Sequence, residues 1–497
     1  MHLALVTVDC LRADHLGCYG HSAPTSPRLD QLAETAWLFD NAVVAGTPTF
    51  YSFPAIHASR HPLDLGRDSV GLVDGEATLA TALRDAGYAT AAFVAGNPYL
   101  ASGGARPSGY AAGFDHYEDF LRPPEPSSDS TPAPSTPAWR RAARRVWDRL
   151  NGPATPKALR RLLFELWLAS LRHRTLDLDH LRQYPPADTV VDRALDWLGR
   201  RPPDQPFFLW VHLMDPHHPY YPPREDVAHM VALNARWSRD DFGPASHRAI
   251  VDPVHALYEA GIRHADAQIG RLIDALDGHG LDGHGLGSGG LHSHGFNGNS
   301  PTLLAVTGDH GEEFLEHGGR YHYPTSLARE LTHVPLLVRD PRRPDAQRVE
   351  GPFSLLDLAP TLLAALGVDP PGTFRGASRL QNDTYVASRR AITECVYDRR
   401  SPWTPGDESG LRLLAVQEGP HKLVVHFERG TAELFDLADD PGERTPLEPE
   451  ALPEVRGRLL RALHEHLGSQ HSQRGSALHV RAQGPRLREL LATGALP

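Results

Sequence analysis

Carboxylates and imidazoles gather at two points where apolar, strand-like runs end. Asp9 follows the run at residues 3–8, and Asp309 and His310 follow the run at residues 303–307. A carboxylate at the end of a buried strand must be hydrogen-bonded, cap a helix or bind a cation, because a bare buried charge is costly. Oxygen and imidazole ligands together are typical of a divalent metal site. We therefore predict these three residues as metal ligands, with a helix N-cap as the alternative role of Asp9.

A hydroxyl nucleophile could come from residues 47–57, where Ser52 precedes Pro54. A serine at a helix N-terminus lies where backbone N–H groups favour an anion, and a nearby cation would lower the pKa of its hydroxyl toward the alkoxide. Capping of the helix is the alternative role of this serine. Thr49 and Thr47 remain alternative nucleophiles.

The elements that must position these groups follow an alternation of strand-like runs and helical patterns. This alternation is typical of an α/β fold with a large, mainly parallel sheet between layers of helices. Functional side chains are then expected at the carboxyl ends of the strands. The strand-like and helical runs lie at residues 3–8, 29–36, 89–94, 190–198, 207–213, 258–276 and 303–307.

The domain organisation follows from where this alternation is interrupted. We predict a catalytic domain over residues 1–370 and a small α+β subdomain with a polar tail over residues 371–497. Residues 122–190 read as an insertion with a proline-rich start, and residues 278–300 as a flexible loop rich in glycine and histidine. Within the insertion, residues 139–174 hold ten basic residues among aromatic and aliphatic ones. That pattern predicts basic amphipathic helices that pack on the main domain, cover an anionic substrate or touch an acidic membrane surface.

Composition sets further limits. The chain has 497 residues, of which 40% are apolar and 22% charged, so a disordered chain is excluded. Its net charge of −11 presents no basic field for nucleic acid. Three cysteines cannot form a disulfide framework and suit a reducing compartment. With neither a signal peptide nor an apolar run of about 20 residues in sight, we expect a cytoplasmic protein without a transmembrane segment.

Several motifs, in this order, resemble those of the sulfatase family in the alkaline phosphatase superfamily. The resemblance extends from the first strand to about residue 465. It is specific because all the motifs occur together and in the order that the family has. The matching segments are residues 8–20, 52–54, 211–220, 258–263 with Asp266, 307–318, 333–338, 357–363 and 434–441.

The resemblance implies an alkaline phosphatase-like fold and a metal-dependent hydrolase of sulfate or phosphate esters. By matched position, Asp9, Asp309 and His310 would hold one divalent cation, and Ser52 would occupy the nucleophile position beside it. The remaining matched groups would contact the ester oxygens or protonate the leaving group. They are the candidate catalytic histidines His217, His317 and His322 and the candidate substrate-binding residue Arg320.

Two departures from the family pattern change the expected chemistry. Sulfatases that carry formylglycine have arginine four residues after the modified side chain, whereas Ile56 stands four residues after Ser52. We therefore expect an unmodified hydroxyl rather than formylglycine, which suits phosphoesters better. Cys10 replaces the usual second aspartate and removes one hard ligand, so Mn²⁺, Mg²⁺ or Zn²⁺ is at least as plausible as Ca²⁺.

Three functions are consistent with these residues. The first is hydrolysis of sulfate esters on the sulfatase scaffold. The second is hydrolysis or transfer of phosphoryl groups through a Ser52 alkoxide, and the third is a non-catalytic family member that binds anions in the same cleft. The expected substrate is a small-molecule, glycan or lipid-head-group ester.

Overall fold

The computed structural model describes residues 1–64, 71–103, 108–121, 184–202, 204–218, 220, 248–278, 301–314, 316–317, 326–398, 410–427 and 429–470. The predicted insertion before residue 184, including residues 139–174, lies outside these residues. So does nearly all of the predicted loop at 278–300, together with His322 and Arg320. None of the described helices is both long and apolar enough to cross a bilayer.

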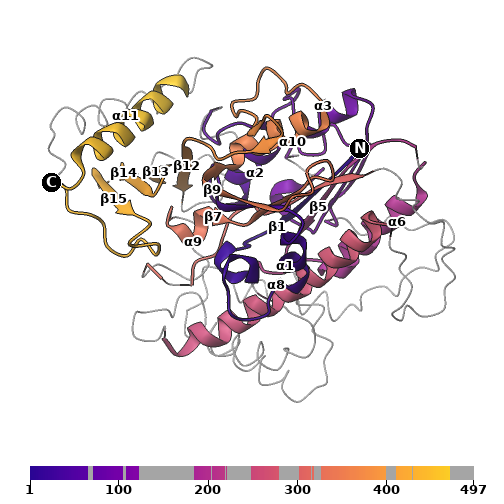
Figure 1. Ribbon diagram of the computed structural model, residues 1–497, viewed down its shortest axis with the longest axis horizontal. Coiled ribbons are helices and arrows are strands. Elements are labelled where there is room, and N and C mark those ends of the chain that lie inside the picture. Colours follow the sequence, from indigo (N-terminus) through magenta and orange to yellow (C-terminus); the bar gives the residue numbers. More distant parts are fainter. Residues whose placement is uncertain are drawn as a thin grey trace, which may run out of the picture.

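A nine-stranded mixed sheet forms the centre of the molecule, in the order β4-β3-β5-β1-β6-β8-β2-β7 with β9 paired to β2 (Figure 1). The neighbours from β4 to β6 are parallel, as are β2 and β9. Strand β8 pairs antiparallel with both β6 and β2, and β7 pairs antiparallel with β2. The strands are β1 (His2–Val8), β2 (Trp37–Val43), β3 (Ala89–Val94), β4 (His116–Glu118), β5 (Phe207–Leu213), β6 (Thr302–Gly308), β7 (His333–Val334), β8 (Leu336–Arg339) and β9 (Gln347–Ser354).

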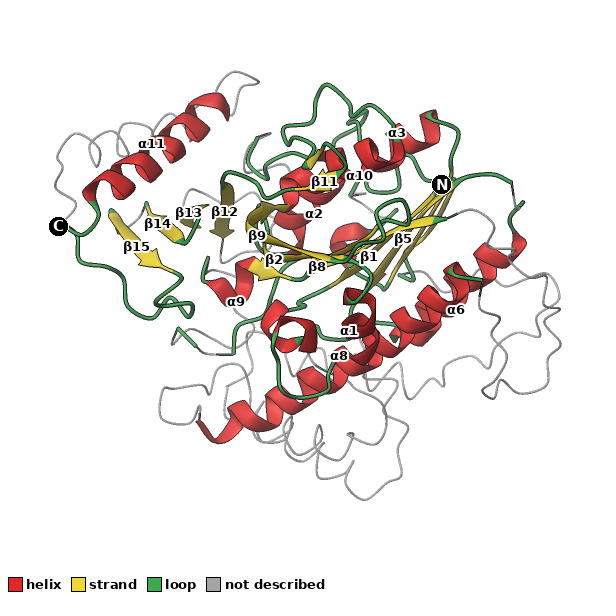
Figure 2. Ribbon diagram, viewed as in Figure 1, coloured by secondary structure: helices red, strands yellow, loops and turns green. Residues whose placement is uncertain are grey.

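Helices cover both faces of this sheet, because alternate residues of each buried strand point to opposite sides. On one face, Ala4, Val6 and Val8 of β1 pack with apolar residues of α1, α6 and α8. On the other face, Leu3 and Leu5 pack with residues of α2, α3 and α10. Figure 2 shows the two helical layers on either side of the strands. These helices are α1 (Pro27–Ala33), α2 (Thr49–Ala58), α3 (Leu79–Asp85), α6 (Ala187–Arg200), α8 (Arg248–Leu276) and α10 (Leu358–Leu366).

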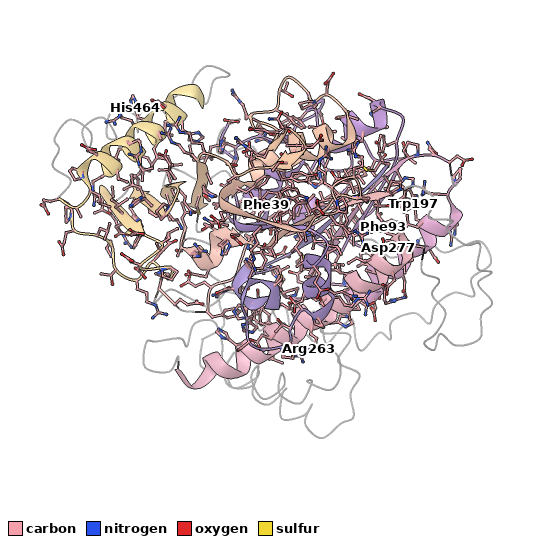
Figure 3. The ribbon with its side chains drawn as sticks, in the orientation of Figure 1. Phe39, Phe93, Trp197, Arg263, Asp277 and His464 are labelled. Atoms are coloured by element: carbon pink, nitrogen blue, oxygen red, sulfur yellow. The ribbon has the colours of Figure 1, made fainter. Side chains whose placement is uncertain are left out.

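The interior is densely filled with aromatic and aliphatic side chains. Figure 3 shows Phe39 in the body of the sheet, where it is fully buried, and Arg263 on the exposed side of α8. At about 25 cal/mol per Å² of apolar surface, burying such side chains is the main favourable term of folding. Close packing also restricts side-chain size: a Cβ added at Gly261 of α8 would come 2.6 Å from the main-chain oxygen of Asp215 after β5.

A second, antiparallel unit completes the described chain. Its four strands follow chain order, and α11 packs its apolar side on them through Leu459, Leu463 and Leu467. The unit touches the central part where Glu394 donates its main-chain N–H to the carbonyl of Ala45 at 2.9 Å. Its elements are β12 (Ala391–Asp398), β13 (Gly410–Glu418), β14 (His421–His426), β15 (Thr431–Asp436) and α11 (Pro453–Gln470). The short helix α9 (Arg329–Thr332) directly precedes β7, and the short strands β10 (Leu380–Gln381) and β11 (Thr384–Tyr385) lie between the two units in the sequence.

The predicted runs at residues 3–8, 89–94, 207–213 and 303–307 are confirmed as β1, β3, β5 and β6, and those at 29–36, 190–198 and 258–276 fall on α1, α6 and α8. The antiparallel strands at the β8 side of the sheet were not predicted. The expected α/β class is confirmed, with a mixed sheet that is mostly parallel.

Candidate active site

The two predicted carboxylates meet because their strands are neighbours. Strand β1 lies between β5 and β6, and all three run parallel. The N–H of Asp9 donates to the carbonyl of Leu213 at 2.9 Å, and the N–H of Asp309 donates to that of Val8 at 3.4 Å. These bonds extend the sheet by one step past the strand ends. Both carboxylates are consequently fixed at one edge of the sheet, and both residues are fully buried.

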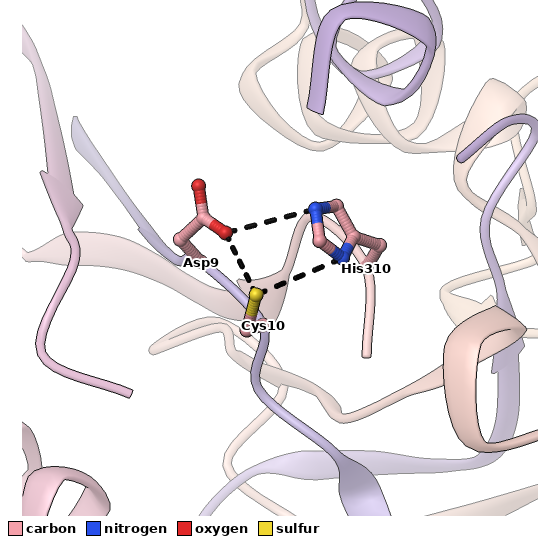
Figure 4. A group of neighbouring side chains, drawn as sticks. All are labelled: Asp9, Cys10 and His310. Carbon is pink, nitrogen blue, oxygen red and sulfur yellow. Dashed lines mark hydrogen bonds and ion pairs between the residues drawn. The ribbon is translucent and has the colours of Figure 1, made fainter. Parts of the chain in front are cut away.

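His310 and Cys10 close the cluster around these carboxylates (Figure 4). The Nε2 atom of His310 lies 3.6 Å from Oδ1 of Asp9 and 3.8 Å from Oδ2 of Asp309. The Cys10 thiol donates to Oδ1 of Asp9 at 3.1 Å, and the Cys10 N–H donates to Oδ1 of Asp309 at 3.3 Å. Cys10 reaches this position with a left-handed φ of 61°. Ligand atoms of Asp9, Cys10 and His310 all lie within 4.8 Å of one another.

A hydrogen bond fixes the orientation of the His310 ring. Its Nδ1 lies 2.7 Å from the carbonyl of Gly311, and a carbonyl can only accept, so Nδ1 carries a proton. The lone pair of Nε2 is therefore directed at the carboxylates whenever the ring is neutral. Metal-binding histidines commonly donate their other N–H to a carbonyl in this way, which fixes the tautomer.

The electrostatics of the cluster are those of charges removed from water. Burial alone would raise the pKa of Asp9, but neighbouring imidazoles outweigh that effect and hold the pKa far below its usual value. Those imidazoles belong to His217, His212 and His310. Burial, and then the negative charge of Asp9, raises the pKa of Asp309 to about 6. The charge on Asp9 therefore disfavours a second negative charge on Asp309.

Burial also acts on the other two members of the cluster. It raises the pKa of the Cys10 thiol well above its ordinary value, and the carboxylates of Glu312 and Asp9 add to the effect. For His310, burial would lower the pKa, but Asp309 and Asp9 outweigh it and raise the pKa. Positive charge is thus favoured at the centre of this cluster.

The hydroxyl that reaches this cluster is that of Thr49. It is the first residue of α2, which follows Pro48, and it is 4% exposed. Its Oγ1 lies 3.2 Å from Oδ2 of Asp9 and 3.1 Å from Nε2 of His310. All ten residues of α2 are buried, so the helix is held rigidly and its N-terminus faces the strand ends.

Ser52, one turn later, is directed elsewhere. Its hydroxyl donates to the main-chain carbonyl of Asp309 at 2.5 Å, and the residue is 1% exposed. Ser52 therefore lies beside the cluster and supports the loop that carries Asp309. Its hydrogen bond does not support the expectation that this hydroxyl touches the cation, whereas the hydroxyl of the alternative nucleophile Thr49 contacts Asp9 and His310.

The candidate catalytic histidines are placed differently from one another. His217 follows β5, and its charge is one of those that lower the pKa of Asp9. The described contacts of His317 are with other residues: its Nδ1 lies 2.6 Å from Oε1 of Glu330 and its Nε2 lies 3.0 Å from the carbonyl of Glu443. The Glu330 hydrogen bond raises the pKa of His317 to about 9.

Two residues of the site were missed from the sequence. Asn97 follows β3 and donates from Nδ2 to Oδ2 of Asp9 at 3.1 Å. His212 lies inside β5, with Nδ1 3.0 Å from the hydroxyl of Thr7 and Nε2 3.7 Å from Oδ2 of Asp9. A polar residue just after a strand could have indicated Asn97. For His212 the only signal was a single imidazole within an apolar strand.

The cluster fits a divalent cation. The Oδ2 atom of Asp309 is buried without a hydrogen-bond partner, although it accepts readily. Asp9, Asp309 and His310 supply two oxygen donors and one imidazole, a donor set suited to Mn²⁺, Mg²⁺ or Zn²⁺. A cation bound between them would neutralise the two buried charges.

The sequence matches known proteins over most of its length. A family model described as Sulfatase matches residues 2–285 and 297–368. An arylsulfatase of Clostridium perfringens is 23% identical over an alignment of 487 positions, which covers 90% of this chain and 90% of the relative. Arylsulfatase K of Xenopus laevis is 26% identical over an alignment of 311 positions, which covers 54% of this chain and 54% of the relative.

Solved structures share the fold over nearly the whole chain. A phosphonate monoester hydrolase of Agrobacterium radiobacter has a TM-score of 0.60 at 18% identity and covers 97% of this chain and 96% of its own. A protein solved with its substrate D-glucosamine-2-N,6-O-disulfate has a TM-score of 0.64 at 17% identity, covering 96% and 99%. At these identities the likeness shows the fold.

Proposed function

The chain belongs to the sulfatase family of sulfuric ester hydrolases, and from this premise we propose that it cleaves esters of a tetrahedral oxyanion with the hydroxyl of Thr49 as nucleophile. One observation carries the proposal. The Thr49 hydroxyl lies within hydrogen-bond distance of both Asp9 and His310, two of the three groups suited to hold a cation. Ser52 has no such contact, because its hydroxyl is bonded to a main-chain carbonyl.

Asp9, Asp309 and His310 would hold the divalent cation. When bound, such an ion stabilises an alkoxide and neutralises charge on the ester oxygens. The chain's own groups can move the proton: the Thr49 O–H donates to Oδ2 of Asp9, which can accept the proton, whereas Nε2 of His310 would hold the cation. As Oγ1 of Thr49 bonds to the central sulfur or phosphorus, the bond to the leaving alcohol breaks. Water then releases the oxyanion and restores the hydroxyl.

The N-terminus of α2 favours the same substrate. Thr49 is the first residue of this helix, where main-chain N–H groups lack partners within the helix and attract anions. His217 lies close enough to influence Asp9 and can donate to an ester oxygen or to the leaving group. The proposed nucleophile, anion-binding N–H groups and proton donor would therefore act at one edge of the sheet.

A threonine nucleophile favours phosphate esters as a second candidate substrate. Formylglycine is an aldehyde, and oxidation at the Cβ of threonine, which carries a methyl group, would give a ketone instead. A covalent intermediate on Thr49 must therefore be resolved by attack of water on the central atom. Phosphoryl intermediates are resolved in this way by hydrolases with hydroxyl nucleophiles, so the aryl phosphate is the informative comparison for the aryl sulfate.

The test is turnover of an aryl sulfate and an aryl phosphate by chelator-treated protein, before and after addition of Mn²⁺, Mg²⁺, Zn²⁺ or Ca²⁺. We expect activity that chelation removes and one of these ions restores, with Asp309→Asn inactive under all conditions. A larger kcat/KM for the phosphate ester supports the second candidate. Turnover of neither ester by the metal-loaded protein would overturn the proposal and favour an anion-binding role.

Intact-mass analysis tests the unmodified hydroxyl separately. We expect the mass calculated from the sequence. A loss of two hydrogens that maps to Ser52 would reveal formylglycine there and would contradict the assignment of Thr49.

A further inference from the structure

A second group of metal-binding side chains lies where the segment after Asp9 meets helix α8. His15 ends a short 3₁₀ helix (Ala13–His15), and His21 follows it in the same segment. Glu259 faces both from α8. Its Oε1 lies 3.0 Å from Nε2 of His21 and 3.5 Å from Nδ1 of His15, and the three ligand atoms lie within 4.8 Å of one another.

A fourth candidate donor stands beside these three. His255 precedes Glu259 by one helical turn on α8, so both side chains emerge from one side of the helix. The ring centroid of His255 lies 5.5 Å from that of His15, and the ring of His21 lies 5.0 Å from His15 on another side. The Nδ1 atom of His15 is buried and has no hydrogen-bond partner.

We propose that His15, His21 and Glu259 form a second divalent-metal site, separate from the Asp9 cluster, that takes Zn²⁺ or another ion preferring imidazole ligands. Tetrahedral Zn²⁺ with ligands at ~2.0–2.1 Å separates its donor atoms by about 3.3–3.4 Å. The two measured separations from Glu259 bracket that value. Two imidazoles among three donors disfavour Mg²⁺ and Ca²⁺, which prefer oxygen.

A third group of the same residue types shows why geometry matters. His61, Glu394 and His466 are also close together, but Nε2 of His466 lies only 2.6 Å from Oε1 of Glu394. That separation is a hydrogen bond, too short for two ligands of one ion. Nε2 of His21 also forms a hydrogen bond with Oε1 of Glu259, at the longer separation of 3.0 Å. The side chains of His21 and Glu259 retain 19% and 22% of their exposure, whereas the residues of the third group are buried. An ion and a water ligand can therefore reach the proposed site.

The proposed ion would tie the segment that follows Asp9 to α8. Tyr258, next to Glu259 on that helix, donates its hydroxyl to the carbonyl of Cys10 at 2.7 Å and accepts from the N–H of Arg12 at 3.0 Å. Its ring packs edge-on against His15 at 5.1 Å. The ion would thus reinforce an attachment that already holds the residue after Asp9.

The experiment is equilibrium dialysis of the full chain against Zn²⁺, with bound zinc measured by mass spectrometry. The variants are His21→Ala and the isosteric Glu259→Gln, and His116→Ala is the control because His116 is a partly exposed histidine 3.7 Å from a carboxylate oxygen of Glu118. We expect each site variant to lose one zinc per chain relative to wild type and the control to lose none. Equal zinc content in wild type and both site variants would overturn the proposal.

Two additions keep this result separate from the catalytic cluster and from misfolding. The Asp9→Asn variant should lose the ion of the Asp9 cluster and keep the ion of the second site. The double variant Asp9→Asn with His21→Ala should therefore lose two ions per chain. Co²⁺ substitution of Asp9→Asn should give the intense visible absorption of a tetrahedral site with imidazole ligands, and further replacement of His21 should abolish it. Absence of that absorption from correctly folded Asp9→Asn, judged by circular dichroism, would also refute the second site.

Discussion

Removing the two hydroxyls of α2 one at a time distinguishes the proposed nucleophile from its neighbour. Thr49→Ala deletes the group that contacts Asp9 and His310. We expect kcat to fall by at least about 10³-fold, equivalent to about 4 kcal/mol of transition-state stabilisation. The free energy of unfolding should change by less than about 1.5 kcal/mol, because Asp9 keeps its bonds to Cys10 and Asn97.

Ser52→Ala should show the opposite profile. It leaves the buried carbonyl of Asp309 without its hydroxyl donor, which costs about 1–3 kcal/mol of stability. Its kcat should stay within about tenfold of wild type, or about 1.4 kcal/mol. The assays are steady-state turnover of aryl phosphate and aryl sulfate, and urea unfolding of each variant. Thr49→Ser, which keeps a hydroxyl, should retain activity. Loss of activity in Ser52→Ala with retention in Thr49→Ala would refute this reasoning.

Two further predictions concern contacts outside the catalytic cluster. The Glu330 hydrogen bond raises the pKa of His317 to about 9, so the stability it contributes is present below pH 6.5 and lost as pH rises to about 9. Because solvent screens the charge of this partly exposed ring, we expect the free energy of unfolding measured in urea to fall by about 1 kcal/mol over that pH range. If the free energy of unfolding of His317→Gln depends on pH as steeply as that of wild type, the prediction is wrong. Lys422→Ala should lower the free energy of unfolding by about 3–5 kcal/mol, because it leaves the buried carboxylate of Glu443 without the ammonium group that lies 2.6 Å away. Adding Glu443→Gln removes that buried charge and should restore part of the lost stability. No restoration in the double variant would argue against the charge as the cause.

The positions of Asp9, Asp309 and His310 could be predicted because they depend on two strong local signals. Each follows an uninterrupted apolar run, and parallel strands place their carboxyl ends at one edge. Hydrophobic periodicity also sufficed for α6 and α8, which are long and amphipathic.

The choice between Thr49 and Ser52 could not be made from the sequence. The two residues are three apart on one helix, so both lie on similar faces, and the point where α2 begins decides which hydroxyl reaches the strand ends. The role of His212 could not be predicted for a related reason. It lies inside a strand, and its contact with Asp9 depends on which strand becomes the neighbour. Strands β7 and β8 are short, and their antiparallel pairing depends on tertiary contacts rather than on local pattern.

The central claim is that one cation lies between Asp9, Asp309 and His310 beside the Thr49 hydroxyl. Its most direct test is anomalous diffraction at the manganese edge from crystals of the full chain grown with Mn²⁺. The account predicts a peak at roughly 2.0–2.6 Å from a carboxylate oxygen of each aspartate and from Nε2 of His310. Ordered manganese elsewhere, with these three side chains still bonded only to one another, would contradict it.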